Sequence, residues 1–233
     1  MRRMDASASP LQQDLVALLE AVRRAEHDLF GALEEAHRDE PLIDGLRARE
    51  VRSHLAAWRS IEARRLLGTE TGDDPRPGDP IDASNARIQA ERSAWSGEQA
   101  AAAADASIDE LIGAIRASTN EALCECDELA AGIGANGANH AIGHLSDIAR
   151  LAGAEDRYAQ LADEVEAILG GSHLMPRDSG VMLYNLACHS GLTGRPDDAV
   201  RLLRTAFARR GDLRDIARED PDLESIREQI AAV

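Results

Sequence analysis

The chain has 233 residues, a formal net charge of −16 at pH 7 and only 3% aromatic residues. It is long enough to bury a hydrophobic core and to form one domain or two. Its negative charge and the absence of a basic patch argue against a nucleic-acid partner. No run of about 18 apolar residues and no N-terminal segment of signal type is present, so we expect a cytoplasmic protein without a membrane partner. Alanine is abundant and strand-type alternation is absent, which predicts an all-α fold.

The spacing of apolar residues predicts two long helices in the first third of the chain. The first spans residues 8–37, and Glu26 lies on its apolar face. The second spans residues 46–68 and ends at Gly68. One face of the second helix carries Val51, His54, Leu55, Trp58 and Ile61. The opposite face is predicted to carry Arg52, Arg59, Ser60 and Arg64.

Two further long helices are predicted after a loop. Residues 69–80 are rich in Gly, Pro and Asp and predict the loop, and residues 82–92 predict a short helix. Ser96-Gly-Glu-Gln99 has the pattern of a capping box and opens a third long helix that ends near residue 117. A fourth helix is predicted between residues 127 and 151. Four amphipathic helices with one long crossover predict a four-helix bundle.

The fourth predicted helix carries a pair of histidines on its inward face. Residues four apart lie one turn apart on the same face of a helix, so the rings of His140 and His144 can converge. The same stripe contains Ile133, Gly137, His140, His144, Ile148 and Leu151. His54 lies on an apolar face as well and can supply a third imidazole. Gly137 either leaves room for a ligand or marks close helix packing or a weak helix start.

Three neutral imidazoles are a suitable ligand set for a divalent metal ion. They bind Zn²⁺ at about 2.0–2.1 Å and leave a fourth position for water or substrate. We expect zinc, although nickel and iron also accept imidazole ligands. Glu26 is the candidate general base or fourth ligand, and the alternative is an ion pair with an arginine of the bundle. Trp58 is a candidate wall of a substrate cavity, and core packing explains it equally well.

These motifs resemble the DinB-like metalloenzyme superfamily, most closely its ClbS/DfsB branch. The similarity rests on His54-Leu-Ala-Ala-Trp58, Arg92-Ser-Ala-Trp95-Ser and the His140, His144 pair, and it covers roughly residues 10–152. It implies a four-helix bundle over residues 1–153 with the three histidines at metal-ligand positions. It also implies a metal-dependent hydrolase or thiol-dependent transferase that acts on a small electrophilic molecule. The alternative is a protein that sequesters such a molecule without turnover.

Residues 154–233 are predicted to form a separate helical region. Residues 180–213 resemble one tetratricopeptide repeat, with small or apolar residues at Leu183, Leu186, Gly194, Ala199 and Ala206. A single repeat cannot bury its own apolar face, so it must pack on a helix predicted at residues 155–169, on the bundle or on a second chain. Its function is either to bind a protein partner, including a second copy, or to cover the bundle.

The remaining histidines and cysteines are predicted to have no special chemistry. His27, His37, His173 and His189 lie off the inward stripes or in loops, so we expect them to be solvated. Cys124 and Cys126 are expected to be reduced thiols, because no second pair of ligands stands at zinc-finger spacing. Cys188 is expected in the core of the C-terminal region.

Overall fold

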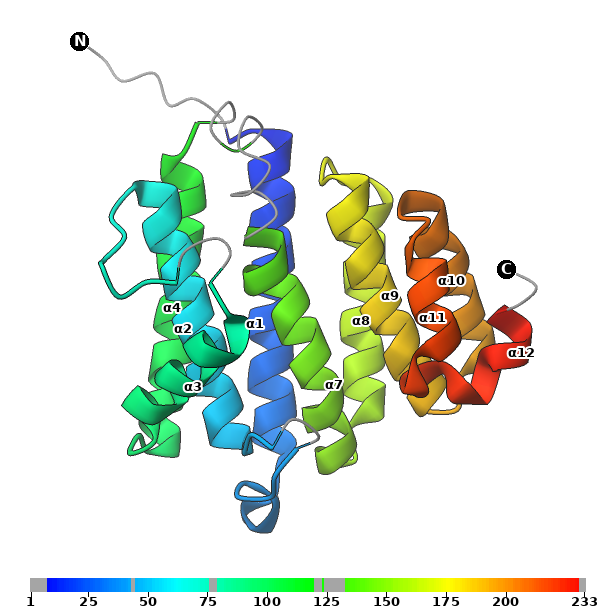
Figure 1. The fold of residues 1–233 in the computed structure, drawn as a ribbon, viewed down its shortest axis with the longest axis horizontal. Coiled ribbons are helices and arrows are strands. Elements are labelled where there is room, and N and C mark those ends of the chain that lie inside the picture. The colour runs from blue at the N-terminus through cyan, green and yellow to red at the C-terminus, as the bar shows by residue number, and fades with distance from the viewer. Residues whose placement is uncertain (1–7, 43–44, 76–78, 120–122, 124–132, 231–233) are drawn as a thin grey trace.

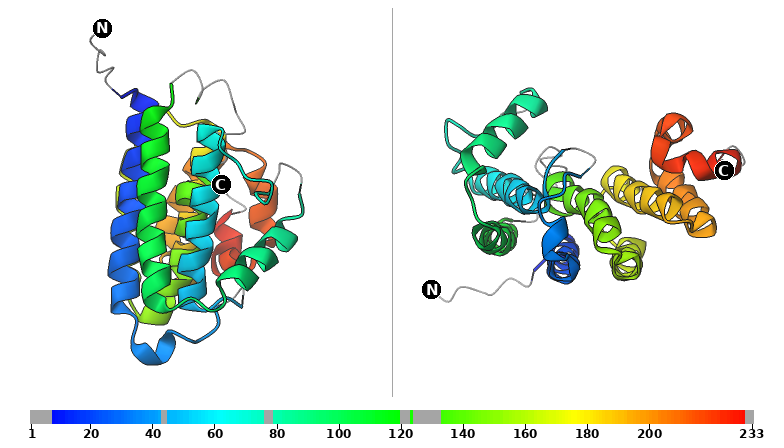
Figure 2. Two further views of the ribbon diagram at one scale, coloured as in Figure 1. Left: turned by 90° about the vertical axis from the view of Figure 1, so that its left-hand side faces the viewer. Right: turned by 90° about the horizontal axis from the view of Figure 1, so that it is seen from below.

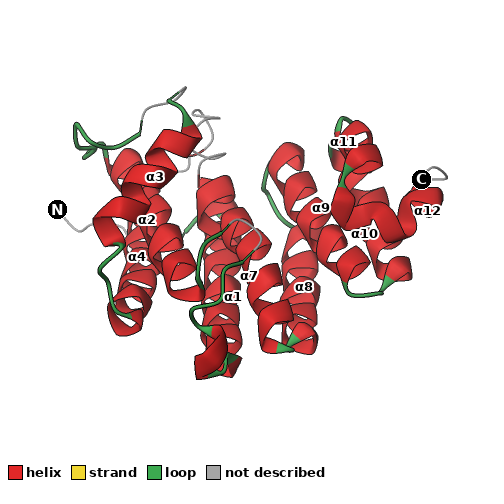
Figure 3. Ribbon diagram, turned by 60° about the horizontal axis from the view of Figure 1, so that its bottom comes forward, coloured by secondary structure: helices red, strands yellow, loops and turns green. Residues whose placement is uncertain are grey.

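The computed structural model describes residues 8–42, 45–75, 79–119, 123 and 133–230. In these parts of the chain the regular structure is helical and no strand is present (Figure 3), apart from an isolated bridge between Pro41 and Arg47. The predicted all-α class is therefore confirmed. Among the described helices, none has the length and apolar character needed to cross a membrane.

The described part of residues 1–152 contains the helices that the sequence predicts there (Figure 1). They are α1 (Pro10–Ala32), α2 (Ala48–Leu67), α3 (Ile81–Arg92), α4 (Gly97–Ala117) and α7 (His140–Ala152). Helix α2 ends at Gly68, which takes the left-handed conformation with φ +65°, and the capping box of Ser96 and Gln99 opens α4. The first predicted helix is wrong at its end: α1 stops at Ala32, and Glu35–His37 forms a separate 3-10 helix, η1.

The helices stand in two adjoining rows when the molecule is seen end on (Figure 2). Helices α4, α1, α8 (Glu155–Gly170) and α10 (Pro196–Arg209) form one row, and α2, α7 and α9 (Pro176–Leu192) form the other. Helix α2 packs most extensively on α4, while α1 contacts α4, α7 and α8. Helices α2 and α7 belong to the same row and contact each other, so their side chains can meet.

Helix α2 is enclosed on several sides. It packs on α4, on α3 and on the segment Ile133–Asn139, which is the π-helix η2. A small apolar cluster of Ala57, Trp58, Ile61 and Ile88 joins it to α3. The predicted solvent-facing position of Arg59 is wrong, because this side chain is fully buried. A helix covered by three neighbours has little face left for solvent.

The C-terminal helices pack on the bundle and share its core. After α10 the chain forms α11 (Leu213–Glu219), the 3-10 helix η3 (Pro221–Ile226) and α12 (Arg227–Ile230). Helix α9 contacts α7, α8 and η2, and one continuous apolar core runs from Leu15 to Ile230. The boundary predicted between residues 153 and 154 falls at Gly153, which ends α7 in the left-handed conformation with φ +59°. A division into two domains there stays a prediction.

Ending the chain after Gly170 is expected to leave a fragment that aggregates or unfolds at a lower temperature. The apolar residues Leu183, Leu186, Leu202 and Leu203 of the α9–α10 hairpin are buried, so their removal uncovers the faces of α7 and α8 that they touch. Size-exclusion chromatography and thermal unfolding of residues 1–170 measure this effect. A soluble monomer that melts as cooperatively and at the same temperature as the whole chain would contradict it.

Candidate metal centre

Helix α2 holds His54 on its buried side. The flanking Val51 and Leu55 are fully buried, and His54 itself is 7% exposed. Trp58 and Ile61 continue the same buried stripe, as the apolar spacing predicts. This packing fixes the direction in which the imidazole leaves the helix, toward the N-terminal end of α7.

His140 is the first residue of α7, and His144 follows it by one helical turn. The π-helix η2 precedes them, so the regular α-helical spacing predicted for residues 133–139 is wrong. Such wide turns are rare and occur often at functional sites, because they change the register at which the next side chains point. The side chain of Ile133, predicted on the same stripe, lies outside the described part of the chain.

The three imidazoles meet at their Nε2 atoms. His54 Nε2 lies 3.1 Å from His140 Nε2, and His144 Nε2 lies 3.2 Å from the same atom. All three histidines offer a ligand atom within 4.8 Å of the others. Two nitrogens bound at about 2.0–2.1 Å to one tetrahedral ion would stand about 3.3 Å apart. The observed separations are close to that spacing, so the three residues fit a single metal ion.

The protonation state of His140 also favours a cation between the three rings. Burial, together with the neighbouring His144, His54 and Arg59, lowers the pKa of His140 to about 2. The ring is therefore neutral at physiological pH. In its plane each ring nitrogen carries either one proton or one lone pair, so a single hydrogen bond cannot satisfy His140 Nε2 against both neighbours. A divalent ion would accept a lone pair from each of the three rings.

His140 Nδ1 departs from the usual environment of a metal ligand. A ligating histidine generally donates its second N–H to a carboxylate, carbonyl or water, which fixes the tautomer. Among the described residues His140 Nδ1 is buried and has no hydrogen-bond partner. The orientation of this ring therefore depends on packing at the start of α7 and on its Nε2 contacts.

Glu26 forms an ion pair with Arg59 instead of joining the histidines. The Glu26 carboxylate accepts a hydrogen bond from the Arg59 guanidinium, and the two side chains are 3% and 0% exposed. Glu26 is not among the residues whose ligand atoms converge with the three imidazoles. Of the two alternatives drawn from the sequence, the structure shows the ion pair.

Arg59 is the residue of this region that sequence reasoning missed. Its Nε donates a hydrogen bond of 3.4 Å to the carbonyl of Gly137 in η2, and its charge contributes to the low pKa of His140. It therefore links the carboxylate of α1 to the turn that carries the first histidine of α7. The position of Glu26 on an apolar helix face could have indicated Arg59, because a buried carboxylate requires a buried partner of opposite charge.

A cavity of about 590 Å³ opens beside His140. Trp58 forms an apolar part of its wall, and its Nε1 donates a hydrogen bond of 3.1 Å to Asn85 Oδ1. Asn136 and Asn139 of η2 line the same cavity. Trp58 thus serves both purposes considered for it, as it also packs in the cluster between α2 and α3. The cavity surface therefore combines apolar, amide and charged side chains, the last being Arg65 and Asp79, and it includes the imidazole of His140.

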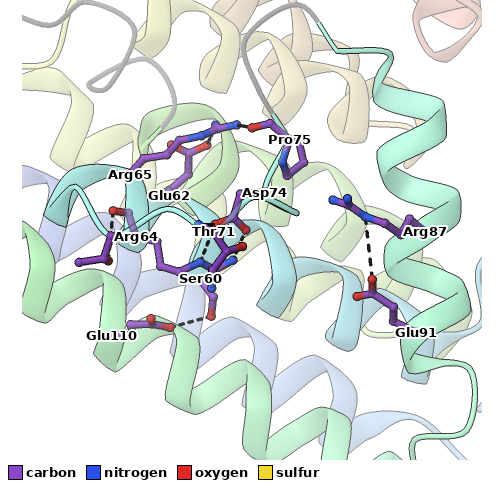
Figure 4. A network of polar contacts seen from close by, with 11 residues as sticks. Ser60, Glu62, Arg64, Arg65, Thr71, Asp74, Pro75, Arg87, Glu91 and Glu110 are labelled. Carbon is purple, nitrogen blue, oxygen red and sulfur yellow. Dashed lines mark hydrogen bonds and ion pairs between the residues drawn. The ribbon is translucent and has the colours of Figure 1, made fainter.

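A polar network joins α2 to residues 71–75, and two of its members, Arg65 and Pro75, line this cavity (Figure 4). The Glu62 carboxylate accepts a hydrogen bond of 2.6 Å from Arg65, whose guanidinium also donates to the carbonyl of Pro75. The Arg64 guanidinium pairs with Asp74 and lowers the pKa of that carboxyl to about 2. These contacts tie residues 69–75 to α2, so Arg65 and Pro75 hold their places in the lining.

Gly137 serves close helix packing. A Cβ added there would lie 3.2 Å from Leu19 Cδ2 and 3.3 Å from Leu111 Cδ2, closer than methyl contacts normally come. Gly137 does not belong to the lining of the cavity beside His140. The structure therefore matches the packing alternative and not the alternative that reserves this space for a ligand. Likewise Ile148 is a core residue and does not line the cavity.

The other histidines differ in their surroundings. His27 and His173 are exposed, as predicted, and each contacts an aspartate. The prediction is wrong for His189, which is 1% exposed and stacks on the buried ring of Tyr158 with centroids 3.8 Å apart. Helix α9 lies between α7 and α10, so the face that carries His189 is covered.

Of the cysteines, the structure describes Cys188. Cys188 is buried on α9, as predicted, and its Sγ lies 3.8 Å from Asp220 Oδ2. Cys124 and Cys126 fall outside the described residues.

Comparison of the chain with protein-family models, with curated proteins and with solved structures finds no match. The similarity to DinB-like metalloenzymes and to tetratricopeptide repeats therefore rests on sequence motifs, and the function has to be argued from the site.

Proposed function

We propose that the protein is a metal-dependent enzyme with a DinB-like bundle, a hydrolase or thiol-dependent transferase that acts on a small electrophilic molecule. His54, His140 and His144 hold the ion, with zinc the first candidate and nickel or iron the others. The observation that carries this proposal is the convergence of three buried or half-buried Nε2 atoms from two helices. One hydrogen bond can join His140 Nε2 to one of its two neighbours but not to both, whereas a bound cation would engage all three rings.

The chemistry follows from the charge of the ligand set. A divalent ion with three neutral imidazoles keeps its full charge, and when bound it lowers the pKa of a water or thiol at its fourth position. His140 stands at the edge of the cavity, so that position is accessible from the cavity. Trp58 excludes water on one side, and the amides of Asn85 and Asn136 offer hydrogen bonds that orient a substrate.

The size of the cavity supports a small molecule as the substrate. Sites for such ligands usually measure about 300–1,000 Å³, and this one measures about 590 Å³. The lining mixes Trp58 and Ile81 with amide side chains and with the charged Arg65 and Asp79, which suits a molecule that combines an apolar part with polar atoms.

Elemental analysis tests the metal directly. Protein purified without an affinity tag is expected to hold about one divalent ion per chain at the three-histidine centre, and His144→Ala should weaken binding because one of three ligands is lost. The His54→Ala, His140→Ala double variant should bind none there. His27→Ala is the matched control, since this exposed histidine pairs with Asp105 away from the centre. Undiminished metal content in the double variant would refute the site.

Chelation provides a second readout of the same prediction. A ligand that binds only the folded state at a thousand times its Kd adds about 4 kcal/mol to the free energy of unfolding. Removing the ion should therefore lower the melting temperature of the parent protein by several degrees more than it lowers that of the double variant.

Sequestration without turnover is the second candidate function. The cavity beside His140 supports it as well, because a metal-bound ligand enclosed by Trp58 and amide groups can be held without being transformed. A protein-binding role of the α9–α10 hairpin, or self-association through it, stays a prediction. The apolar residues on which that role was based are buried against the rest of the chain.

A further inference from the structure

A second group of potential metal ligands lies in the C-terminal part of the molecule. Cys188 comes from α9, whereas Asp220 directly precedes η3 and Asp222 lies within it. The thiol sulfur and one oxygen of each carboxylate all lie within 4.8 Å of one another. The three residues join two elements that are far apart in the sequence.

The spacing of these atoms suits a thiolate and carboxylates around one ion. Zinc binds a thiolate at about 2.3 Å and a carboxylate oxygen at about 2.0–2.2 Å, so tetrahedral ligands of these two kinds stand about 3.6 Å apart. Cys188 Sγ lies 3.8 Å from Asp220 Oδ2. Only a small adjustment of the thiol is needed.

A buried nitrogen beside these residues points independently to a ligand. Cys188, Asp220 and Asp222 line a cavity of about 180 Å³, and His189 and Ser146 line it too. His189 Nδ1 pairs with the Ser146 hydroxyl at 2.8 Å, but Nε2, in a residue only 1% exposed, has no hydrogen-bond partner among the described residues. A buried polar atom is normally hydrogen-bonded, because leaving it unpaired destabilises the folded state. A hydrated cation in the cavity would bring water molecules that can pair with it.

The Asp220 carboxylate is held in place before any ion binds. The Tyr184 hydroxyl donates a hydrogen bond of 2.6 Å to Asp220 Oδ2, and the Asp222 N–H donates one of 2.9 Å to Asp220 Oδ1. Carboxylates that bind metals are generally hydrogen-bonded in this way. Helix α9 also approaches η3 closely, because a Cβ added at Gly191 would lie 2.9 Å from the Asp222 carbonyl oxygen. The ligands therefore stand on a rigid frame.

We propose that Cys188, Asp220 and Asp222 form a second metal site that binds a thiophilic divalent cation such as Zn²⁺ or Cd²⁺. The site is separate from the three-histidine centre and does not depend on it. On binding, the thiol proton passes to the buffer, the sulfur–metal bond forms, and η3 becomes tied to α9. Its role is structural, because both of these elements belong to the C-terminal part that covers α7.

Cadmium titration of the full-length protein tests this site, because a cadmium–thiolate bond has a charge-transfer band in the ultraviolet and a cadmium–imidazole bond does not. Cys124→Ala and Cys126→Ala are introduced first, so that Cys188 is the one remaining thiol of the three in the chain. Burial raises the pKa of this thiol, so a mildly alkaline buffer is used. We expect the band to appear, to be lost in Cys188→Ser, and to persist in His140→Ala.

Variants of the carboxylate ligands distinguish a metal site with several ligands from a single reactive thiol. Asp222→Asn should weaken cadmium binding by tenfold or more, whereas Asp215→Asn, in an exposed pair with Arg218, should leave it unchanged. Circular dichroism checks that each variant is folded. Absence of the band at saturating cadmium, or equal affinity in Asp222→Asn and the parent, would overturn the proposal. Neither result would bear on the three-histidine centre.

Discussion

Replacing Glu26 with alanine is expected to lower the free energy of unfolding by about 3–5 kcal/mol, because it leaves the Arg59 guanidinium buried without its partner. Arg59 is fully buried, and Glu26 is its ion-pair partner. Among the described residues Arg59 Nη1 is already buried without a hydrogen-bond partner, so none of them offers an alternative contact that is ready to take over. Urea unfolding at neutral pH measures the loss.

Two comparisons make this result specific to the buried pair. Glu164→Ala removes an exposed partner of Arg24 and should cost at most about 1 kcal/mol. The Glu26→Leu, Arg59→Met double variant should be more stable than Glu26→Ala, because an apolar pair of similar volume replaces a buried ion pair at little cost. Equal stability of Glu26→Ala and Glu164→Ala would show that Glu26 and Arg59 do not depend on each other.

The double variant also distinguishes two roles of Glu26. If the carboxylate only positions Arg59 and, through the Gly137 carbonyl, the start of α7, the folded double variant should bind metal with altered affinity and keep some turnover. If Glu26 is the general base, the folded double variant should bind metal and lose turnover. Measuring metal affinity and rate in the same preparation separates the two.

The local sequence pattern was sufficient to predict most of the helices and the shared helix face of His140 and His144. The capping box at Ser96 and the left-handed Gly68 depend on neighbouring residues alone, so their positions could be predicted. The same holds for His140 and His144, because residues four apart share a helix face wherever the helix packs. The approach of His54 to His140 is different. These residues are 86 positions apart, and the sequence supplied only inward faces and a family resemblance for it.

The wrong predictions have a common physical cause. A single sequence does not show how many other helices pack against a given helix. The prediction for Arg59 assumed that a helix with one apolar stripe leaves its other side to solvent, but α3, α4 and η2 together enclose α2. His189 was assigned to solvent for the same reason, although α7 and α10 flank α9. The π-helix has no signal in apolar spacing, since Gly, Ala and Asn dominate residues 134–139. Such features depend on tertiary packing, which a single sequence does not display.

The largest functional effect is expected for His140→Ala with reactive small molecules. Epoxide, cyclopropane and activated-alkene probes, given to zinc-loaded protein with and without a low-molecular-weight thiol, should be hydrolysed or form adducts, and this activity should disappear in the variant. The reason is geometric: His140 is the one histidine of the three that contacts both of the others through Nε2, and it also lines the cavity. Its loss removes a ligand and opens the centre.

The outcomes of this experiment separate the candidate functions. Hydrolysis without thiol supports activation of water, while products that require thiol support a transferase. Trp58→Leu should raise KM more than it lowers kcat, because it changes the cavity wall and not the three ligands. Tight binding of a probe by the metal-loaded protein without any product would instead establish sequestration. If no probe binds or reacts although the metal is present, the electrophile proposal fails, because the cavity beside His140 would then lack the reactivity that its charge and enclosure predict.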